Sequence, residues 1–359
     1  MNPKFLIPTP DPLQVQPFWF QLLLILTFYI HLILMNTMLG ISIIAFWENI
    51  RGKCDNKQIC KDISKTLPFL IGFTVNFGVA PLLFLQNIYG HFMFTSSILM
   101  GVFWLSVIIL LIISYYAAYI FKMRYDEIYP FRSIIIGIST IGMASIAFII
   151  CNNITMMERP ESWIRYFDNP SGLLLNLSDP TLAPRYLHFL LSAIAIGGLS
   201  IALFYKFRYQ RGYTSAYNKI GYGCKIFSLT TIVNFAVGFW FLESLHPLNK
   251  GITTPIGLFF TISLFTGITT GLLAIYNGLQ ERVIPTLYWA MVTIFFMVLV
   301  RDFVRAIHLG PYFHLSEFTI NPQYSPLIIF LICFLCGIIL IGWMAKCAFK
   351  ATELKGGRP

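Results

Sequence analysis

Nine apolar runs, each long enough to cross a lipid bilayer, dominate this sequence. They fall at about 18–46, 67–90, 93–121, 132–155, 185–205, 222–245, 254–277, 283–306 and 325–347. A helix needs roughly 20 apolar residues to span about 30 Å of hydrocarbon. The runs are continuous and lack the alternation of lipid-facing strands, which argues against a transmembrane barrel. The sequence therefore predicts an all-α, polytopic membrane protein with about nine transmembrane helices.

The low content of charged side chains supports this assignment. Charged residues make up 11% of the chain and hydrophobic residues 57%, whereas a soluble globular domain carries about a quarter charged residues. We therefore expect contact with membrane lipid and a multi-pass location in a membrane. Residues 1–350 are predicted to form a single transmembrane helical bundle, with an outer cap at 156–184 and a cytoplasmic tail at 351–359.

The distribution of Lys and Arg predicts the orientation. Of the 25 basic residues, 18 lie in the C-terminal tail and in the connections after the first, third, fifth and seventh runs, which leaves seven on the opposite side. Because basic residues concentrate in cytoplasmic loops, the N-terminus is predicted to lie outside and the C-terminus in the cytoplasm. The net charge of +10 mostly reflects this bias. Its spread over short loops argues against a nucleic-acid partner.

With this orientation, all the histidines fall on the outer side of the bilayer. Histidine is the commonest side-chain metal ligand, so the asymmetry indicates a metal or cofactor layer. Histidines at helix ends are also ordinary interfacial residues, and His246 and His314 fit that description. His31 and His188 differ, because their neighbours are apolar or aromatic and a polar group in hydrocarbon needs a partner. The six histidines are His31, His91, His188, His246, His308 and His314.

These histidines indicate haem b rather than zinc or a covalently attached haem. A structural zinc site needs four converging Cys or His ligands, and the seven cysteines are not placed to supply them. The sequence has no Cys-x-x-Cys-His motif for a c-type haem. A haem b held by a histidine that projects from a helix fits the aromatic-rich apolar runs. Lipid contact and interfacial belts would also account for much of the aromatic content.

Charged residues near the outer end of the eighth run form a second candidate feature. Arg301, Arg305 and His308 stand at i, i+4 and i+7, on one helical face. Intramembrane charges are usually functional and arginine pairs well with carboxylates, so this face could hold haem propionates or position a quinone head group. Arg301 could instead pair with Asp302 or Glu243 and extend outward. Glu243 is a candidate proton acceptor for quinol oxidation, or else an interfacial carboxylate.

Several stretches, taken in order, resemble subunit I of cytochrome bd quinol oxidase. Residues 29–32 (Tyr-Ile-His-Leu) and 38–40 (Met-Leu-Gly) resemble its first helix, where a histidine ligates haem. Residues 74–78 (Thr-Val-Asn-Phe-Gly) are similar to Asn-Phe-Ala-Leu-Gly in its second helix. Residues 152–160 resemble Asn-Gly-Trp-Met-Gln-x-Pro at the end of its fourth helix, and 186–188 resemble the Phe-x-His that supplies an axial haem b ligand. Nine helices and an outward N-terminus also agree with that family.

The sequence departs from the family where oxygen chemistry is concerned. The connection from Pro247 to Thr253 is too short for the family's quinol-binding outer loop. The methionine haem ligand of the seventh helix and the haem-ligating glutamate of the eighth have no evident counterpart. The resemblance therefore implies a haem b scaffold rather than an oxygen-reducing centre. It implies His31 and His188 as ligands of the haem iron, with His91 or His308 completing the coordination.

Together these observations favour a haem b-containing membrane subunit of a respiratory electron-transfer complex. It would act as an oxidoreductase subunit, exchanging electrons between the membrane quinone pool and a periplasmic multihaem c-type cytochrome within a larger complex. Segment 156–184 would offer the docking surface. The alternatives are a bd-type terminal quinol oxidase, and a haem-free quinone-binding anchor or transporter in which the buried histidines only form hydrogen bonds.

Overall fold

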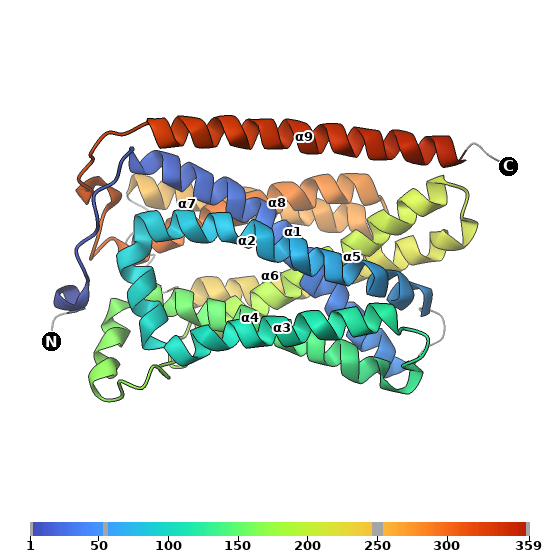
Figure 1. Cartoon of the computed structure of the whole chain (residues 1–359), viewed down its shortest axis with the longest axis horizontal. Helices are drawn as coiled ribbons and strands as arrows, with labels where there is room; N and C mark the ends of the chain where they lie inside the picture. Colours follow the sequence, from blue (N-terminus) through green and yellow to red (C-terminus); the bar gives the residue numbers. More distant parts are fainter. Residues whose placement is uncertain (1–2, 53–56, 246–253, 357–359) are drawn as a thin grey trace. The chain divides into compact units, whose positions relative to one another are not determined.

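The computed structural model describes residues 3–52, 57–245 and 254–356 as an almost entirely helical chain (Figure 1). These residues contain nine helices that are long and apolar enough to cross a membrane, and no strand. The prediction of an all-α, multi-pass membrane protein is thereby confirmed. The helices are α1 (Pro17–Arg51), α2 (Lys57–Leu99), α3 (Gly101–Met123), α4 (Arg132–Glu158), α5 (Leu182–Gln210), α6 (Tyr217–Ser244), α7 (Pro255–Leu279), α8 (Val283–Leu309) and α9 (Ser325–Gly356).

The chain divides into two compact units. The larger unit comprises Met1–Thr9 and Phe20–His314, and the smaller one comprises Pro10–Trp19 and Leu315–Pro359. In the smaller unit, the backbone N–H of Leu13 donates to Thr319 O at 2.9 Å, and Leu13 O accepts from the N–H of Asn321 at 2.8 Å. This pairing ties the residues before α1 to the segment that leads into α9. A single bundle over 1–350 stays a prediction.

The second helix, α2, is longer than predicted and bends at Tyr89. We expected helices at 67–90 and 93–121 with His91 in a tight turn between them, but α2 continues to Leu99 (Figure 1). At Tyr89 the backbone leaves the helical region, with φ −129° and ψ 23°, and the helix then resumes. His91 therefore lies inside α2, and its placement in a turn was wrong. Gly90 and His91 interrupt the apolar run, but further apolar residues follow them and the helix continues to Leu99. The interruption therefore corresponds to a kink within one helix and not to a turn between two helices.

Glycines allow α5 to pack closely against two neighbours within the larger unit. A Cβ on Gly197 would lie 2.5 Å from the carbonyl carbon of Gly40 in α1, and a Cβ on Gly40 would overlap the backbone of Ala193. Farther along α5, a Cβ on Gly198 would lie 2.9 Å from Gly223 O in α6. Small residues let helix backbones approach in this way when lipid supplies no hydrophobic driving force between them. The α1–α5 and α5–α6 crossings thus hold the centre of the unit together.

We call the end of the helices that carries the connections 124–131 and 211–216 the inner end, and the opposite one the outer end. Near the inner end, the carboxylate of Asp62 in α2 accepts from Tyr205 Oη and from Arg208 Nη1 of α5, both at 2.7 Å. Glu48 of α1 accepts from Tyr222 Oη of α6 at 2.7 Å. A buried carboxylate is stable only when it is paired or hydrogen-bonded. These contacts therefore join α1, α2, α5 and α6 and pair carboxylates that would be costly to bury without a partner.

Candidate functional site

A group of buried charged side chains lies at the outer end, where α4, α5 and α8 meet. Glu158, the last residue of α4, accepts from Arg185 Nη2 of α5 at 2.6 Å. The same carboxylate oxygen, Oε2, lies 3.5 Å from His308 Nδ1 of α8. Only 1% of the Glu158 side chain is exposed, against 12% for Arg185 and 7% for His308. A carboxylate at the end of one helix therefore holds a guanidinium and an imidazole from two others.

The last turns of α8 supply the rest of this group. Asp302 Oδ1 accepts from Arg305 Nη1 at 3.0 Å, and Asp302 Oδ2 accepts from Gln21 Nε2 of α1 at 2.7 Å. The Arg305 guanidinium lies 5.2 Å from the ring centre of Tyr89, at the kink of α2. The Arg305 side chain is only 1% exposed. The kink therefore places an aromatic face over a buried cation, an arrangement that stabilises desolvated charge.

Arg301 completes the group and makes it cationic. Its guanidinium lies 4.1 Å from the ring centre of Phe28 in α1, one helical turn from His31. We call Glu158, Arg185, Arg301, Asp302, Arg305 and His308 the outer cluster. Three arginines face two carboxylates there, so the cluster carries a net positive charge even with a neutral histidine. A buried site of this kind favours an anionic group.

Several atoms of the outer cluster make no hydrogen bond with any other described residue. They include Glu158 Oε1, Arg185 Nε, Arg305 Nε and both ring nitrogens of His308, all of them buried. An unsatisfied buried donor or acceptor costs about 1–3 kcal/mol. Such atoms are rare in folded proteins and need an explanation at each site. Several of them on neighbouring side chains indicate a place that receives a polar partner.

His31 lies between α1 and α2. Its Nδ1 is 3.1 Å from the carbonyl oxygen of Thr74, and a Cβ on Gly78 would approach its ring to 2.9 Å. A ring nitrogen that donates to a backbone carbonyl is typical of a metal-ligating histidine, because that bond fixes the tautomer and leaves Nε2 as the ligand. Gly78 is the residue that allows the imidazole to lie flat against α2. The geometry therefore suits His31 to coordination through Nε2.

His188 lies between α5 and α6. Its ring contacts α6 at Gly238, where an added Cβ would come within 3.3 Å of Cε1, and the ring centre of Phe241 lies 6.5 Å away. Asn234 interacts with the ring and donates through its amide to Ser192 Oγ at 2.8 Å. Among the described residues, neither His188 Nδ1 nor Asn234 Oδ1 meets a partner at hydrogen-bonding geometry.

The other histidines have different surroundings. The ring of His91 packs against Phe92 and Phe313, with centroid distances of 4.3 and 4.6 Å. His308 faces Glu158 of α4. His314 is exposed, and His246 lies outside the described residues. The residues that the structure describes contain no group of three or more His, Cys, Asp or Glu that could hold a bare metal ion.

The predicted arginine face divides into three separate contacts. Arg305 pairs with Asp302, His308 approaches Glu158, and Arg301 lies over Phe28. Glu243 is exposed at the end of α6. Sequence reasoning missed Glu158 and Arg185, which both stand where an apolar run meets the segment 156–184. The sequence does show a charged residue at each of those two helix ends. That these two residues pair with each other can be seen only in the folded structure.

The segment after α4 closes over the outer end of that helix. Arg159 Nε lies 2.9 Å from Asp179 Oδ2, and 2% of the Asp179 side chain is exposed. Trp163 is buried and donates through Nε1 to Met156 O at 2.8 Å. These contacts order the segment on α4, beside the carboxylate of Glu158. The outer cluster is therefore covered by polypeptide rather than left open to water.

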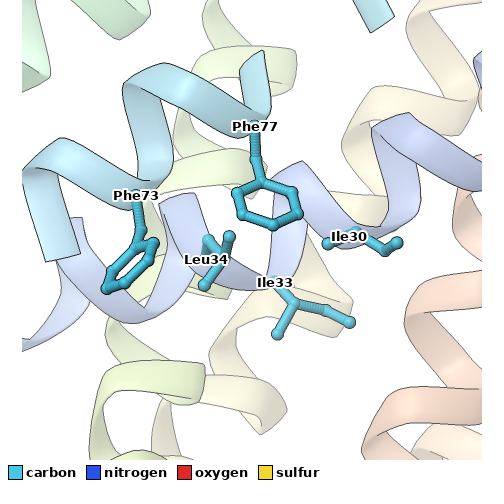
Figure 2. Close-up of a pocket in the computed structure, with 5 residues that line it drawn as sticks. All are labelled: Ile30, Ile33, Leu34, Phe73 and Phe77. Atoms are coloured by element: carbon cyan, nitrogen blue, oxygen red, sulfur yellow. The ribbon is translucent and has the colours of Figure 1, made fainter. Parts of the chain in front are cut away.

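An apolar groove runs beside His31 on the surface formed by α1 and α2. Ile30, Ile33 and Leu34 of α1 line it together with Phe73 and Phe77 of α2, and its volume is about 370 Å³ (Figure 2). Ile30 precedes His31, and Phe77 precedes the Gly78 that contacts the imidazole. Figure 2 shows the two phenylalanine rings extending from α2 toward α1, with Leu34 between them. The groove fits an apolar chain, such as a lipid tail or an isoprenoid.

Comparison with known proteins adds no family assignment. No protein-family model matches the chain, and no curated protein is significantly similar to it.

Removing the charge of Asp302 should destabilise the protein by about 3–5 kcal/mol, because Asp302→Asn leaves the buried Arg305 without its anion. Asp126→Asn is the matched control. Asp126 is exposed and bonds to Lys61 Nζ at 2.7 Å, and that hydrogen bond lowers the pKa of its carboxyl. Solvent screens such pairs, so this variant should keep its unfolding temperature. Thermal unfolding in detergent measures both, and equal melting temperatures would contradict the burial argument.

Proposed function

We propose that this chain is a haem b-containing membrane subunit of a respiratory electron-transfer complex in the bacterial inner membrane. It exchanges electrons between the membrane quinone pool and a periplasmic multihaem c-type cytochrome. Its outer end faces the periplasm, in accordance with the distribution of basic residues. The observation that carries the proposal is the environment of His31, an intramembrane imidazole whose Nδ1 is engaged by the Thr74 carbonyl.

Two kinds of side chain among the described residues suit a haem b group: histidines that could bind its iron and arginines that could pair with its propionates. The bond from His31 Nδ1 to the Thr74 carbonyl leaves Nε2 as the ligand atom. His31 and His188 each have a glycine on the neighbouring helix, Gly78 and Gly238, against the ring. The cationic outer cluster includes Arg301, whose guanidinium lies over the ring of Phe28, one helical turn from His31, and arginine is suited to propionate carboxylates. Haem b supplies reversible one-electron transfer when bound. His31 lies between α1 and α2 and His188 between α5 and α6, so each of them would hold a haem independently of the other.

The remaining parts of the proposal follow from chemistry at the outer end. Quinones are apolar molecules with polar head groups, and the groove at Ile30, Leu34 and Phe77 suits an isoprenoid tail. Electrons leave toward a water-soluble partner, so the segment that covers the outer end, 159–181, is the surface on which a c-type cytochrome would dock. Protons leave on the same side.

A haem-free quinone-binding anchor is the second candidate. It is favoured by the hydrogen bond from His31 to Thr74, which also satisfies a purely structural imidazole. A bd-type terminal oxidase is the third, and rapid quinol-dependent oxygen uptake would distinguish it. The proposal predicts electron transfer to a c-type cytochrome without oxygen consumption.

Absorption spectroscopy of the purified, folded protein tests the proposal. We expect a Soret band, and a reduced α-band typical of haem b that develops on addition of quinol as well as dithionite. Extraction into pyridine should identify the non-covalent haem. A monodisperse protein that carries no Soret absorbance, when expressed in cells that supply haem, would favour the haem-free anchor instead.

A further inference from the structure

The pairing of Glu158 with His308 has the geometry of a positioned base. Glu158 Oε2 lies 3.5 Å from His308 Nδ1 and is fixed by Arg185 at 2.6 Å. The contact is longer than a hydrogen bond in this structure; when it shortens, the carboxylate favours the tautomer in which Nδ1 carries the proton and Nε2 is an acceptor. His308 Nε2 is buried and makes no hydrogen bond with the residues that the structure describes. Such contacts are often long before substrate binds and tighten in the complex.

We propose that His308 is the base that takes the protons of quinol during its oxidation, and that Glu158 is the positioning residue that orients it. This inference rests on the proposed function and names a residue for its quinol site. The substrate class is a hydroquinone, whose hydroxyl donates to His308 Nε2. Glu158 then faces the imidazolium that forms and stabilises it, as a carboxylate does for any histidine base.

The step balances as follows. The O–H bond of one hydroxyl breaks and an N–H bond forms at Nε2, while one electron passes to the haem-bearing chain of the complex. His308 releases that proton to the outer side and then accepts the second proton as the second electron leaves. Each hydroquinone thus yields one quinone, two protons and two electrons. The oxidant is the c-type cytochrome partner, which the proposed function supplies.

The charges around His308 favour this role over a plain ion pair. Glu158 comes from α4, Arg185 from α5, and Arg301, Asp302 and Arg305 from α8 itself; Tyr89 of α2 interacts with Glu158 and Arg305. Asp302 already forms an ion pair with Arg305 and accepts a hydrogen bond from Gln21. Glu158 is shared between Arg185 and His308 and keeps Oε1 without a partner among the described residues. A structural pair would satisfy these atoms, whereas a base must keep one position for its substrate.

The experiment compares wild type with His308→Gln, Glu158→Gln and Glu243→Gln, and with the control His314→Gln, in which the substituted histidine is exposed. Duroquinol is mixed with each protein, and reduction of the bound haem is followed by stopped flow across the neutral pH range. Binding of a decyl-quinone is measured separately by quenching of Trp fluorescence. Haem content and melting temperature are recorded for every variant.

His308→Gln should slow reduction by about 100-fold, the range for loss of a positioned base, and abolish the rise of rate with pH. Glu158→Gln should slow it roughly 10–100-fold, as loss of an orienting partner does, with haem content and quinone binding retained. His314→Gln should match wild type. If His308→Gln or Glu158→Gln does not fold, Glu158→Asp carries the test, since it keeps the imidazole and a carboxylate for the buried Arg185 and should also slow reduction.

Wild-type rate and pH profile in His308→Gln would overturn the inference, as would a folded Glu158→Gln protein with an unaltered rate. A loss of pH dependence in Glu243→Gln instead would move the base to that exposed carboxylate. A wild type that contains no haem, or that quinol does not reduce, is a failure of the proposed function itself and is distinguishable from these results.

Discussion

Replacing Gly197 with alanine should sharply reduce the amount of folded protein. The new Cβ would stand 2.5 Å from the carbonyl carbon of Gly40 in α1, and the atom it meets is backbone, which cannot rotate away. The helices would have to separate, at a cost of roughly 1–3 kcal/mol for an overpacked methyl group. A rigid backbone neighbour places this site at the upper end of that range. Gly40→Ala should behave in the same way, because its Cβ would overlap Ala193.

The matched control is Gly72→Ala in α2. A Cβ there meets only Tyr115 Oη, at 3.5 Å, which is ordinary van der Waals contact. Alanine also has the better helix propensity, by about 1 kcal/mol, so this variant should be as stable as wild type or slightly more stable. Yield of monodisperse protein and melting temperature in detergent measure all three. A stable Gly197→Ala protein would mean that α1 and α5 do not pack as described.

The all-helical fold class could be predicted from the sequence because only helices and closed barrels can span a lipid bilayer. Backbone groups in hydrocarbon must satisfy each other, so an apolar run of sufficient length becomes a helix. Runs such as 185–205 and 283–306 therefore appear as α5 and α8 with their ends moved by a few residues. Helix ends are set by polar residues that extend beyond hydrocarbon, and hydropathy does not locate them.

The kink of α2 and the composition of the outer cluster could not be predicted in this way. Gly90 and His91 interrupt an apolar run, and both a turn and a kink are compatible with that pattern; the structure has the kink at Tyr89. Glu158 and Arg185 are 27 positions apart, and their contact depends on how α4 and α5 pack. Spacing along one helix identified Arg301, Arg305 and His308 as neighbours, but their partners belong to other helices.

The candidate ligands His31 and His188 were predicted from the sequence because a polar side chain among apolar neighbours is conspicuous. The structure adds what surrounds them, a carbonyl of α2 for one and an amide of α6 for the other. Each partner lies in the next helix along the chain, and which of its residues faces the imidazole depends on how the two helices pack, so sequence patterns do not reveal it. The two imidazoles lie in different helix pairs, that of His31 between α1 and α2 and that of His188 between α5 and α6.

Substitution of the two histidines should have the largest effect on cofactor content. His31→Ala removes the ligand whose Nδ1 bonds to Thr74, and His188→Ala removes the one beside Asn234. Loss of an outer-shell partner alone costs roughly 10–100-fold in metal affinity, so loss of the ligand itself should cost at least as much. We expect at least one of the two variants to lose its haem while remaining folded. His314→Ala, on an exposed histidine, is the control.

The most direct test is the ratio of haem to polypeptide in purified wild type, His31→Ala, His188→Ala and His314→Ala, with monodispersity checked for each. The account predicts haem in wild type and in the control, and its loss from at least one of the two ligand variants. Full haem content in both ligand variants would contradict the assignment of His31 and His188, and a folded wild type without haem would contradict the proposed function.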